Sequence, residues 1–200
     1  MTLKLNGSSS GYTAIDAPAT AGSNTLVLPA NNGSAGQVLQ TDGSGNLSWA
    51  TLANSGRILQ VVTATTTTET SSTTTTYADT GLTKTINLAS TGSKVLVLVN
   101  QAVGFVRGDD GLIGVGLKLM RDTTSLRVDP INPQMWKAKV GTGSGGEYSM
   151  GFHHTFVDID SPSTAGNVTY KTQIAQANAG TAYAQNDSRQ SWIVLAEIGG

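Results

Sequence analysis

From Arg57 to Ile198 one pattern recurs in the sequence: short runs in which apolar, often β-branched residues alternate with polar ones. A period of two places alternate side chains on opposite faces of a strand. The runs that predict strands are Arg57–Thr63, Leu82–Leu88, Lys94–Val106, Leu112–Arg121, Ser125–Asp129, Tyr148–Ile159, Val168–Ala177 and Ser191–Ile198. Glycine, Asn, Asp, Pro or Ser clusters separate most of them, and no segment has the spacing of a long amphipathic helix. We therefore expect an all-β fold, with a jelly-roll-like antiparallel β-sandwich over residues 56–200.

Residues 1–55 have a different composition, which is rich in Gly, Ser, Ala and Asn. Short apolar islands interrupt them at Leu3–Leu5, Leu26–Leu28, Val38–Leu39 and Leu47–Trp49. None is long enough to form a core within one chain. The sequence predicts an extended, strand-poor N-terminal stem with residues 42–46 as a hairpin turn. We expect its islands to pair or pack between chains in a trimeric stem, or to pack against a particle surface.

The charge of the chain excludes several classes of protein. Its 200 residues include 12 Lys and Arg, 13 Asp and Glu and no Cys, and only 12% are charged, about half the usual share. With a net charge of -1, the chain has no large positive electrostatic field that would attract nucleic acid. Disulfides and thiolate sites are excluded, and without an apolar run of about 20 residues we expect no membrane insertion. The start, Met1–Leu5, lacks the apolar run of a signal peptide.

Several phrases carry a resemblance to a known family. Residues 36–49, GQVLQTDGSGNLSW, look like a module that recurs in phage tail-fibre and appendage proteins ahead of a C-terminal domain. Residues 77–83, followed by Lys94–Val99, resemble the opening of a knob domain of marine and cyanobacterial phage structural proteins, and residues 170–173 and 193–198 are similar to its end. The resemblance implies a virion appendage with a C-terminal trimeric β-sandwich knob.

Two functions follow from this resemblance. The first is a short homotrimeric phage fibre, located in the virion, that attaches to other phage structural proteins through residues 1–55 and contacts the host surface through its knob. The alternative is a capsid decoration or head-fibre protein that binds and stabilises the shell without a receptor role. Where residues 1–30 attach would distinguish them. A homotrimer suits both, because closed symmetry pairs identical edges without open-ended growth.

No residue pattern indicates chemistry. The sequence has neither a nucleophile elbow nor an H-E-x-x-H motif, so we expect no enzyme activity, no catalytic residue and no cofactor. His153, His154, Asp158 and Asp160 form the one cluster of metal-ligand types. Adjacent strand residues point to opposite faces, so we expect no metal site within one chain, although a three-fold axis could gather one histidine from each chain.

Host contact is expected on loops, which carry recognition on rigid β scaffolds. The candidate loops are Arg107–Gly111, Lys137–Gly146 and Thr181–Arg189. Their low charge favours a host surface glycan, bound through amide and aromatic side chains. The possible contact residues are Trp136, Asn178, Tyr183, Gln185 and Asn186. Trp136 has a favoured alternative as a buried loop anchor, Trp49 is expected at the junction of stem and knob, and Trp192 in the core.

Overall fold

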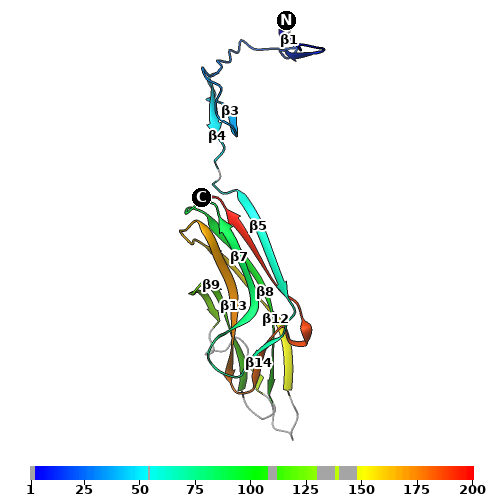
Figure 1. Ribbon diagram of the computed structural model, residues 1–200, viewed down its shortest axis with the longest axis vertical. Coiled ribbons are helices and arrows are strands. Elements are labelled where there is room, and N and C mark those ends of the chain that lie inside the picture. Colours follow the sequence, from blue (N-terminus) through cyan, green and yellow to red (C-terminus); the bar gives the residue numbers. More distant parts are fainter. Residues whose placement is uncertain (1–2, 54, 108–111, 130–137, 140–147) are drawn as a thin grey trace. The chain divides into compact units, whose positions relative to one another are not determined.

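The computed structural model describes residues 3–53, 55–107, 112–129, 138–139 and 148–200. The chain divides into two compact units, Met1–Ala53 and Asn54–Gly200. Figure 1 shows the chain coloured by sequence. The two units meet between Ala53 and Asn54, two residues before the boundary that we expect from the sequence, between residues 55 and 56.

The first unit consists of two hairpins. β1 (Leu3–Asn6) pairs with β2 (Tyr12–Ile15), and β3 (Gln37–Thr41) pairs with β4 (Leu47–Thr51). Three of the four apolar islands therefore lie in strands, whereas the fourth contributes only a single bridge from Val27 to Asn46.

The turn between β3 and β4 is held by one carboxylate. Asp42 accepts hydrogen bonds from the Asn46 side chain at 2.7 Å and from the backbone N–H groups of Ser44 at 2.8 Å and Asn46 at 3.2 Å. These bonds, that of the Asn46 side chain first, hold the pKa of Asp42 below its usual value. Gly43 and Gly45 supply the positive φ angles of 81° and 94° that the turn requires.

The first unit has no hydrophobic core, because no residue among 3–53 is buried. Its large apolar side chains stand in solvent in the single chain: Leu3, Leu5, Tyr12, Ile15, Leu26, Val27, Leu28, Val38, Leu39 and Leu52. Leu28 is 71% exposed and Ile15 66%. Backbone pairing alone gives a two-stranded hairpin little stability in water.

The second unit contains two antiparallel sheets. The β8 sheet has the hydrogen-bonded order β5-β15-β8-β14-β6, with β12 on the other edge of β8, and the β13 sheet has the order β10-β9-β13-β7, with β11 on β9. The bounds are β5 (Ile58–Thr66), β6 (Thr70–Ser72), β7 (Ala78–Leu88), β8 (Lys94–Arg107), β9 (Leu112–Arg121), β10 (Thr124–Asp129), β11 (Ala138–Lys139), β12 (Tyr148–Asp160), β13 (Gly166–Asn178), β14 (Thr181–Ala184) and β15 (Ser191–Ile198). Figure 1 shows the long strands of this unit running alongside one another.

In three places, two short strands follow one another and together occupy the position of one full-length strand in a sheet. We call each such position a lane. β15 pairs with residues 94–100 of β8 and β14 with residues 103–106, so these two follow one another along the same edge. β5 pairs with β15 and β6 with β14, so β5 and β6 share the next lane. β10 and β11 likewise follow one another along β9. The lanes are numbered in chain order as β5 with β6 (1), β7 (2), β8 (3), β9 (4), β10 with β11 (5), β12 (6), β13 (7) and β14 with β15 (8). Over the described strands, the two sheets then have the lane orders 1-8-3-6 and 2-7-4-5.

The core lies between the sheets and follows the alternation of the sequence. On β8, Val95, Val97 and Val99 are fully buried, and they pack with residues of the facing sheet such as Leu117 and Ile174. The predicted all-β sandwich is thus confirmed. Each of the eight predicted runs overlaps a strand. The threonine-rich stretch Thr63–Thr76, whose residue type favours strands, contains the end of β5 and the whole of β6.

A buried polar cluster also joins the two sheets. Gln101 of β8 donates to Ser191 Oγ at 2.9 Å and accepts from Thr172 Oγ1 of β13 at 2.7 Å. Thr172 Oγ1 lies 2.6 Å from Thr80 Oγ1 of β7. All four residues are buried, and a satisfied polar cluster of this kind favours one alignment of the sheets over its neighbours.

Ion pairs close the side of the sandwich at β12. Arg121 Nη1 of β9 lies 2.8 Å from Asp160 Oδ1, and the Tyr170 hydroxyl of β13 donates to Asp160 Oδ2 at 2.7 Å. Burial, reinforced by this bond to Asp160, raises the pKa of Tyr170 far above its usual value. Arg127 Nε and Asp158 Oδ2 form a second pair at 3.0 Å. Asp158 and Asp160 of β12 therefore pair with arginines of the other sheet and help to hold the two sheets together.

Candidate functional site

The chain turns sharply after β14. Gln185 (φ 55°), Asp187 (φ 56°) and Ser188 (φ 56°) take left-handed backbone conformations within or beside a 3₁₀ turn, η1 (Asn186–Ser188). Such conformations are unfavourable for non-glycine residues and often accompany functional segments. The turn lays Asn186 across Gly104 of β8, where a methyl group on Gly104 would lie 2.5 Å from Asn186 Cγ.

A recess of about 220 Å³ lies beside this turn, lined by Glu69, Val106, Ser149, Tyr183, Asn186 and Asp187. The Asp187 N–H donates to Glu69 Oε2 at 3.2 Å, and Asp187 Oδ2 accepts from Asn186 Nδ2 at 3.0 Å. Arg189 Nη2 lies 3.5 Å from the same Asp187 oxygen. Two carboxylates, a hydroxyl and an aromatic ring at one recess are groups that can accept hydrogen bonds from sugar hydroxyls and stack on a sugar ring.

The structure brings together two of the five predicted contact residues. Tyr183, which is half-buried, and Asn186, which is buried with 8% of its surface exposed, both line the recess. Asn178 ends β13 and Trp136 precedes β11; the Asn178 side chain and the whole of Trp136 lie outside the described residues. Sequence reasoning missed Glu69, which lies 118 positions from Asp187 in the chain and joins the recess through the pairing of β6 with β14.

The prediction for Gln185 is wrong for the single chain. Gln185 is fully buried, its N–H donates to Ala102 O at 2.9 Å, and its amide lies 3.0 Å from Ser191 Oγ. It belongs to the buried polar cluster rather than to a contact surface. The expected loop Thr181–Arg189 is likewise corrected, because its first four residues form β14. Residues 108–111 and most of Lys137–Gly146 lie outside the described residues.

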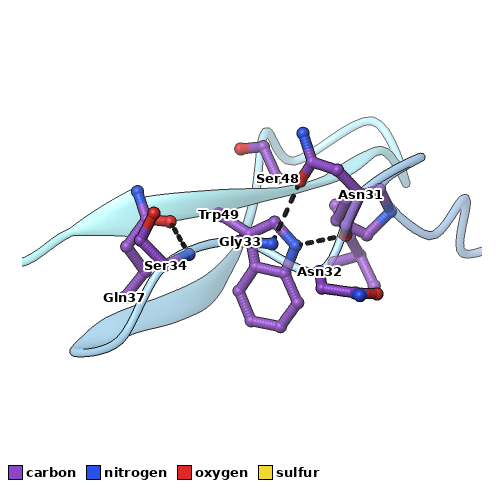
Figure 2. A pocket seen from close by; sticks show the side chains of 9 residues that line it. Asn31, Asn32, Gly33, Ser34, Gln37, Ser48 and Trp49 are labelled. Atoms are coloured by element: carbon purple, nitrogen blue, oxygen red, sulfur yellow. Dashed lines mark hydrogen bonds between the residues drawn. The ribbon is translucent and has the colours of Figure 1, made fainter.

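A second recess, of about 660 Å³, lies in the first unit around Trp49 (Figure 2). The indole Nε1 donates to Asn31 O at 2.8 Å, and Gly33 lies so close that a methyl group there would be 2.6 Å from the ring. Gln37 Oε1 accepts from Ser34 N at 2.7 Å across the same loop. Trp49 is thus held by residues of its own unit, and its place at the junction of stem and knob stays a prediction.

Two other sequence predictions concern β12 and β15. His153 Nδ1 lies 2.5 Å from Asn100 Oδ1 on the outer face, whereas the ring of His154 meets the edge of Phe156 at 4.6 Å. Within the described part of the chain no three His, Asp or Glu side chains are placed to hold a metal ion together. Trp192 is not a core residue: its neighbour Ile193 is buried, so Trp192 faces outward and is half-buried.

The described residues define the second unit as an antiparallel β-sandwich, to which an unburied N-terminal unit is joined. None of the helices described is long and apolar enough to span a membrane.

Comparisons with known proteins give distant likenesses only. No family model matches the sequence, and no curated protein matches it. Among solved structures, the chain is similar to the Gx strain of infectious bursal disease virus (TM-score 0.35, 13% identity) and to the VP2 subviral particle of that virus (TM-score 0.35, 12% identity). Each alignment covers 77% of this chain and 35% of the viral chain. Dimeric latent PorU from Porphyromonas gingivalis also aligns (TM-score 0.31, 12% identity), over 78% of this chain and 15% of PorU.

Proposed function

We propose that this chain is a structural protein of a bacteriophage particle, a short homotrimeric fibre that attaches to the virion through residues 1–55. The observation that carries the proposal is the first unit, in which ten large apolar side chains are exposed and no described residue is buried. Such a segment is stable when copies of the chain, or a particle surface, cover it. Closed three-fold symmetry lets identical islands cover one another.

The strand order of the second unit supports the same proposal. The lane order 1-8-3-6 and 2-7-4-5 is that of a jelly roll, an architecture used by viral capsid and lectin domains. Folds host many functions, so the order supports a virion role without specifying one. The weakly charged, threonine-rich chain without Cys suits a protein whose surfaces pack against copies of themselves.

For host contact we propose the recess at Tyr183, with a surface glycan as its ligand. The Tyr183 ring offers a stacking surface, and Asp187 and Glu69 offer acceptors for hydroxyl groups. Replacing Tyr183 by Ala in particles is expected to lower host-cell adsorption at least tenfold, since an aromatic anchor typically contributes more than about 1.4 kcal/mol to binding. Asn186→Ala is expected to act in the same direction.

The control is Asn87→Ala, an exposed polar residue on the other sheet, which should leave adsorption unchanged. All variants are checked for equal incorporation into particles and equal thermal unfolding. Normal adsorption by Tyr183→Ala and Asn186→Ala would refute the receptor role. That result would favour the alternative function, a capsid decoration or head-fibre protein that binds and stabilises the shell.

A further inference from the structure

On the outer face of the β8 sheet, two rows of side chains that cross all four lanes are apolar apart from Thr63. The register aligns Val61, Ala196, Leu96 and Ile159 in one row and Thr63, Val194, Leu98 and Val157 in the next. Their sequence neighbours on β8 and β15 are buried in the core, so these side chains point away from it. Val61, Val157 and Ile159 are 55%, 59% and 59% exposed. Ile58 and Ile198 extend the surface at one end and Trp192 at the other. We call these residues the β8 outer patch.

The outer face of the β13 sheet has the opposite character. Its cross-strand pairs are Thr85 with Thr169, Asn87 with Asn167, and Thr83 with Lys171. The Thr85 and Thr169 hydroxyls are 2.8 Å apart, and Lys171 Nζ lies 2.8 Å from Asp79 Oδ2. An antiparallel sheet with one solvated face normally has polar residues on it, as the β13 sheet does. The β8 outer patch departs from this rule and therefore suits a protein surface rather than water.

The size of the patch fits a protein interface. Four lanes about 4.8 Å apart and about four residues along β8 give the two complete rows roughly 19 Å by 13 Å, or about 250 Å² in projection. With Ile58, Ile198 and Trp192 added, the patch approaches the largest apolar patches that single-chain proteins expose, and such patches are often functional. The two rows amount to about a third of the surface that each partner contributes to a typical interface.

We propose that the β8 outer patch is covered by a second copy of this chain, an inference that rests on the homotrimer of the proposed function. The two complete rows contain no charged side chain, so like copies do not repel one another and a strongly charged partner gains nothing. The first unit independently exposes apolar islands that copies would cover. One occupant, the neighbouring subunit, therefore satisfies both surfaces of each chain.

Single-cysteine variants test this inference, because the natural chain contains no Cys. Val157→Cys places a thiol on the β8 outer patch, and Val128→Cys places the matched control on the outer face of the other sheet, where Val128 is 46% exposed. The purified full-length variants are reacted with a maleimide while their mass is measured by light scattering. We expect Val157→Cys to react at least tenfold more slowly than Val128→Cys in the trimer, and at a comparable rate after dilution to monomer.

Three results would overturn the inference. Equal labelling in an intact trimer would refute this interface and leave the homotrimer standing. A monomeric mass at every concentration with equal labelling would refute both the interface and the homotrimer. Protection of Val157→Cys in a monomer would show that the chain covers its own patch. A second variant, Val61→Glu with Val157→Glu, should keep the circular dichroism spectrum of a β protein and weaken association at least a hundredfold.

Discussion

Deletion of residues 1–55 is expected to abolish incorporation of the protein into particles and to leave a folded sandwich. Both sheets of the second unit, and the core between them, lie beyond that point. The backbone bonds that tie the start of this unit to its end, Gly56 N to Gly199 O and Gly199 N to Arg57 O, are retained. Incorporation should fall at least a hundredfold, because the proposed attachment surface is removed entirely.

Two measurements check the deletion. Circular dichroism with thermal unfolding should show a β-sheet spectrum and a cooperative transition, and purified particles should contain no truncated protein. Full-length chain carrying Ser9→Ala, a change at an exposed bend between β1 and β2, serves as the control and should be incorporated normally. An unfolded truncated protein would contradict the assigned boundary, and a truncated protein that still enters particles would contradict attachment through residues 1–55.

Glu197→Ala is expected to destabilise the sandwich by about 2–4 kcal/mol, because a buried carboxylate that satisfies several donors is lost. Glu197 of β15 is fully buried. It accepts from Gln60 Nε2 at 2.6 Å, from Ser93 Oγ at 2.6 Å and from Ala89 N at 2.7 Å. These bonds connect β5, β15 and the loop between β7 and β8. Without the carboxylate, the buried Ser93 hydroxyl and the backbone N–H of the exposed Ala89 both lose their acceptor.

The same carboxyl makes stability depend on pH. Burial alone would raise the pKa of Glu197, but the hydrogen bonds from Gln60, Ser93 and Ala89 outweigh it and hold the pKa below its usual 4.5. A group whose pKa is lowered by folding stabilises the protein fully above its unfolded pKa, and this contribution is lost as the pH falls through the folded pKa. The wild-type protein should therefore lose stability below about pH 4.5 more steeply than Glu197→Ala.

Urea unfolding at pH 7 and at several values below pH 5 measures both effects. The control is Glu69→Gln, at an exposed carboxylate, which should change stability by less than about 0.5 kcal/mol. A Glu197→Ala protein as stable as the wild type at pH 7 would show that the three donors find other acceptors. Parallel pH profiles for the wild type and Glu197→Ala would contradict the lowered pKa.

The longer strands could be predicted from the sequence because their alternation is long and their turn signals are strong. The predicted run Ser191–Ile198 coincides with β15, and Leu112–Arg121 with β9. The short strands β2, β11 and β14 were not predicted. Two to four residues, such as Thr181–Ala184, carry no measurable period, and their pairing is decided by the long strands beside them.

The sequence could place Tyr183 and Asn186 near a surface but could not separate them from Gln185. All three follow one another within four positions, and an amide side chain suits a buried cluster as well as a ligand site. Burial of Gln185 depends on Gln101 and Ser191, which only the fold brings together. Glu69 was missed for the same reason, since its neighbour in space is far away in the chain.

The β8 outer patch could not be predicted from the sequence without knowledge of the fold. Lys94–Val99 reads Lys-Val-Leu-Val-Leu-Val, which is apolar on both faces of the strand. Such a run indicates that both faces are covered, yet it does not say by what. The sandwich covers the face of Val95, Val97 and Val99 with the β13 sheet, and leaves Leu96 and Leu98 for the proposed second copy.

The molar mass of the intact chain in solution tests the central claim most directly. One chain has a mass of 20.6 kDa, so a homotrimer has three times that, about 62 kDa. Size-exclusion chromatography with light scattering, or sedimentation equilibrium, at micromolar concentration is predicted to give about 62 kDa. A stable species of 20.6 kDa under these conditions would contradict the trimeric fibre, because the exposed apolar residues of both units would then tolerate water without a partner.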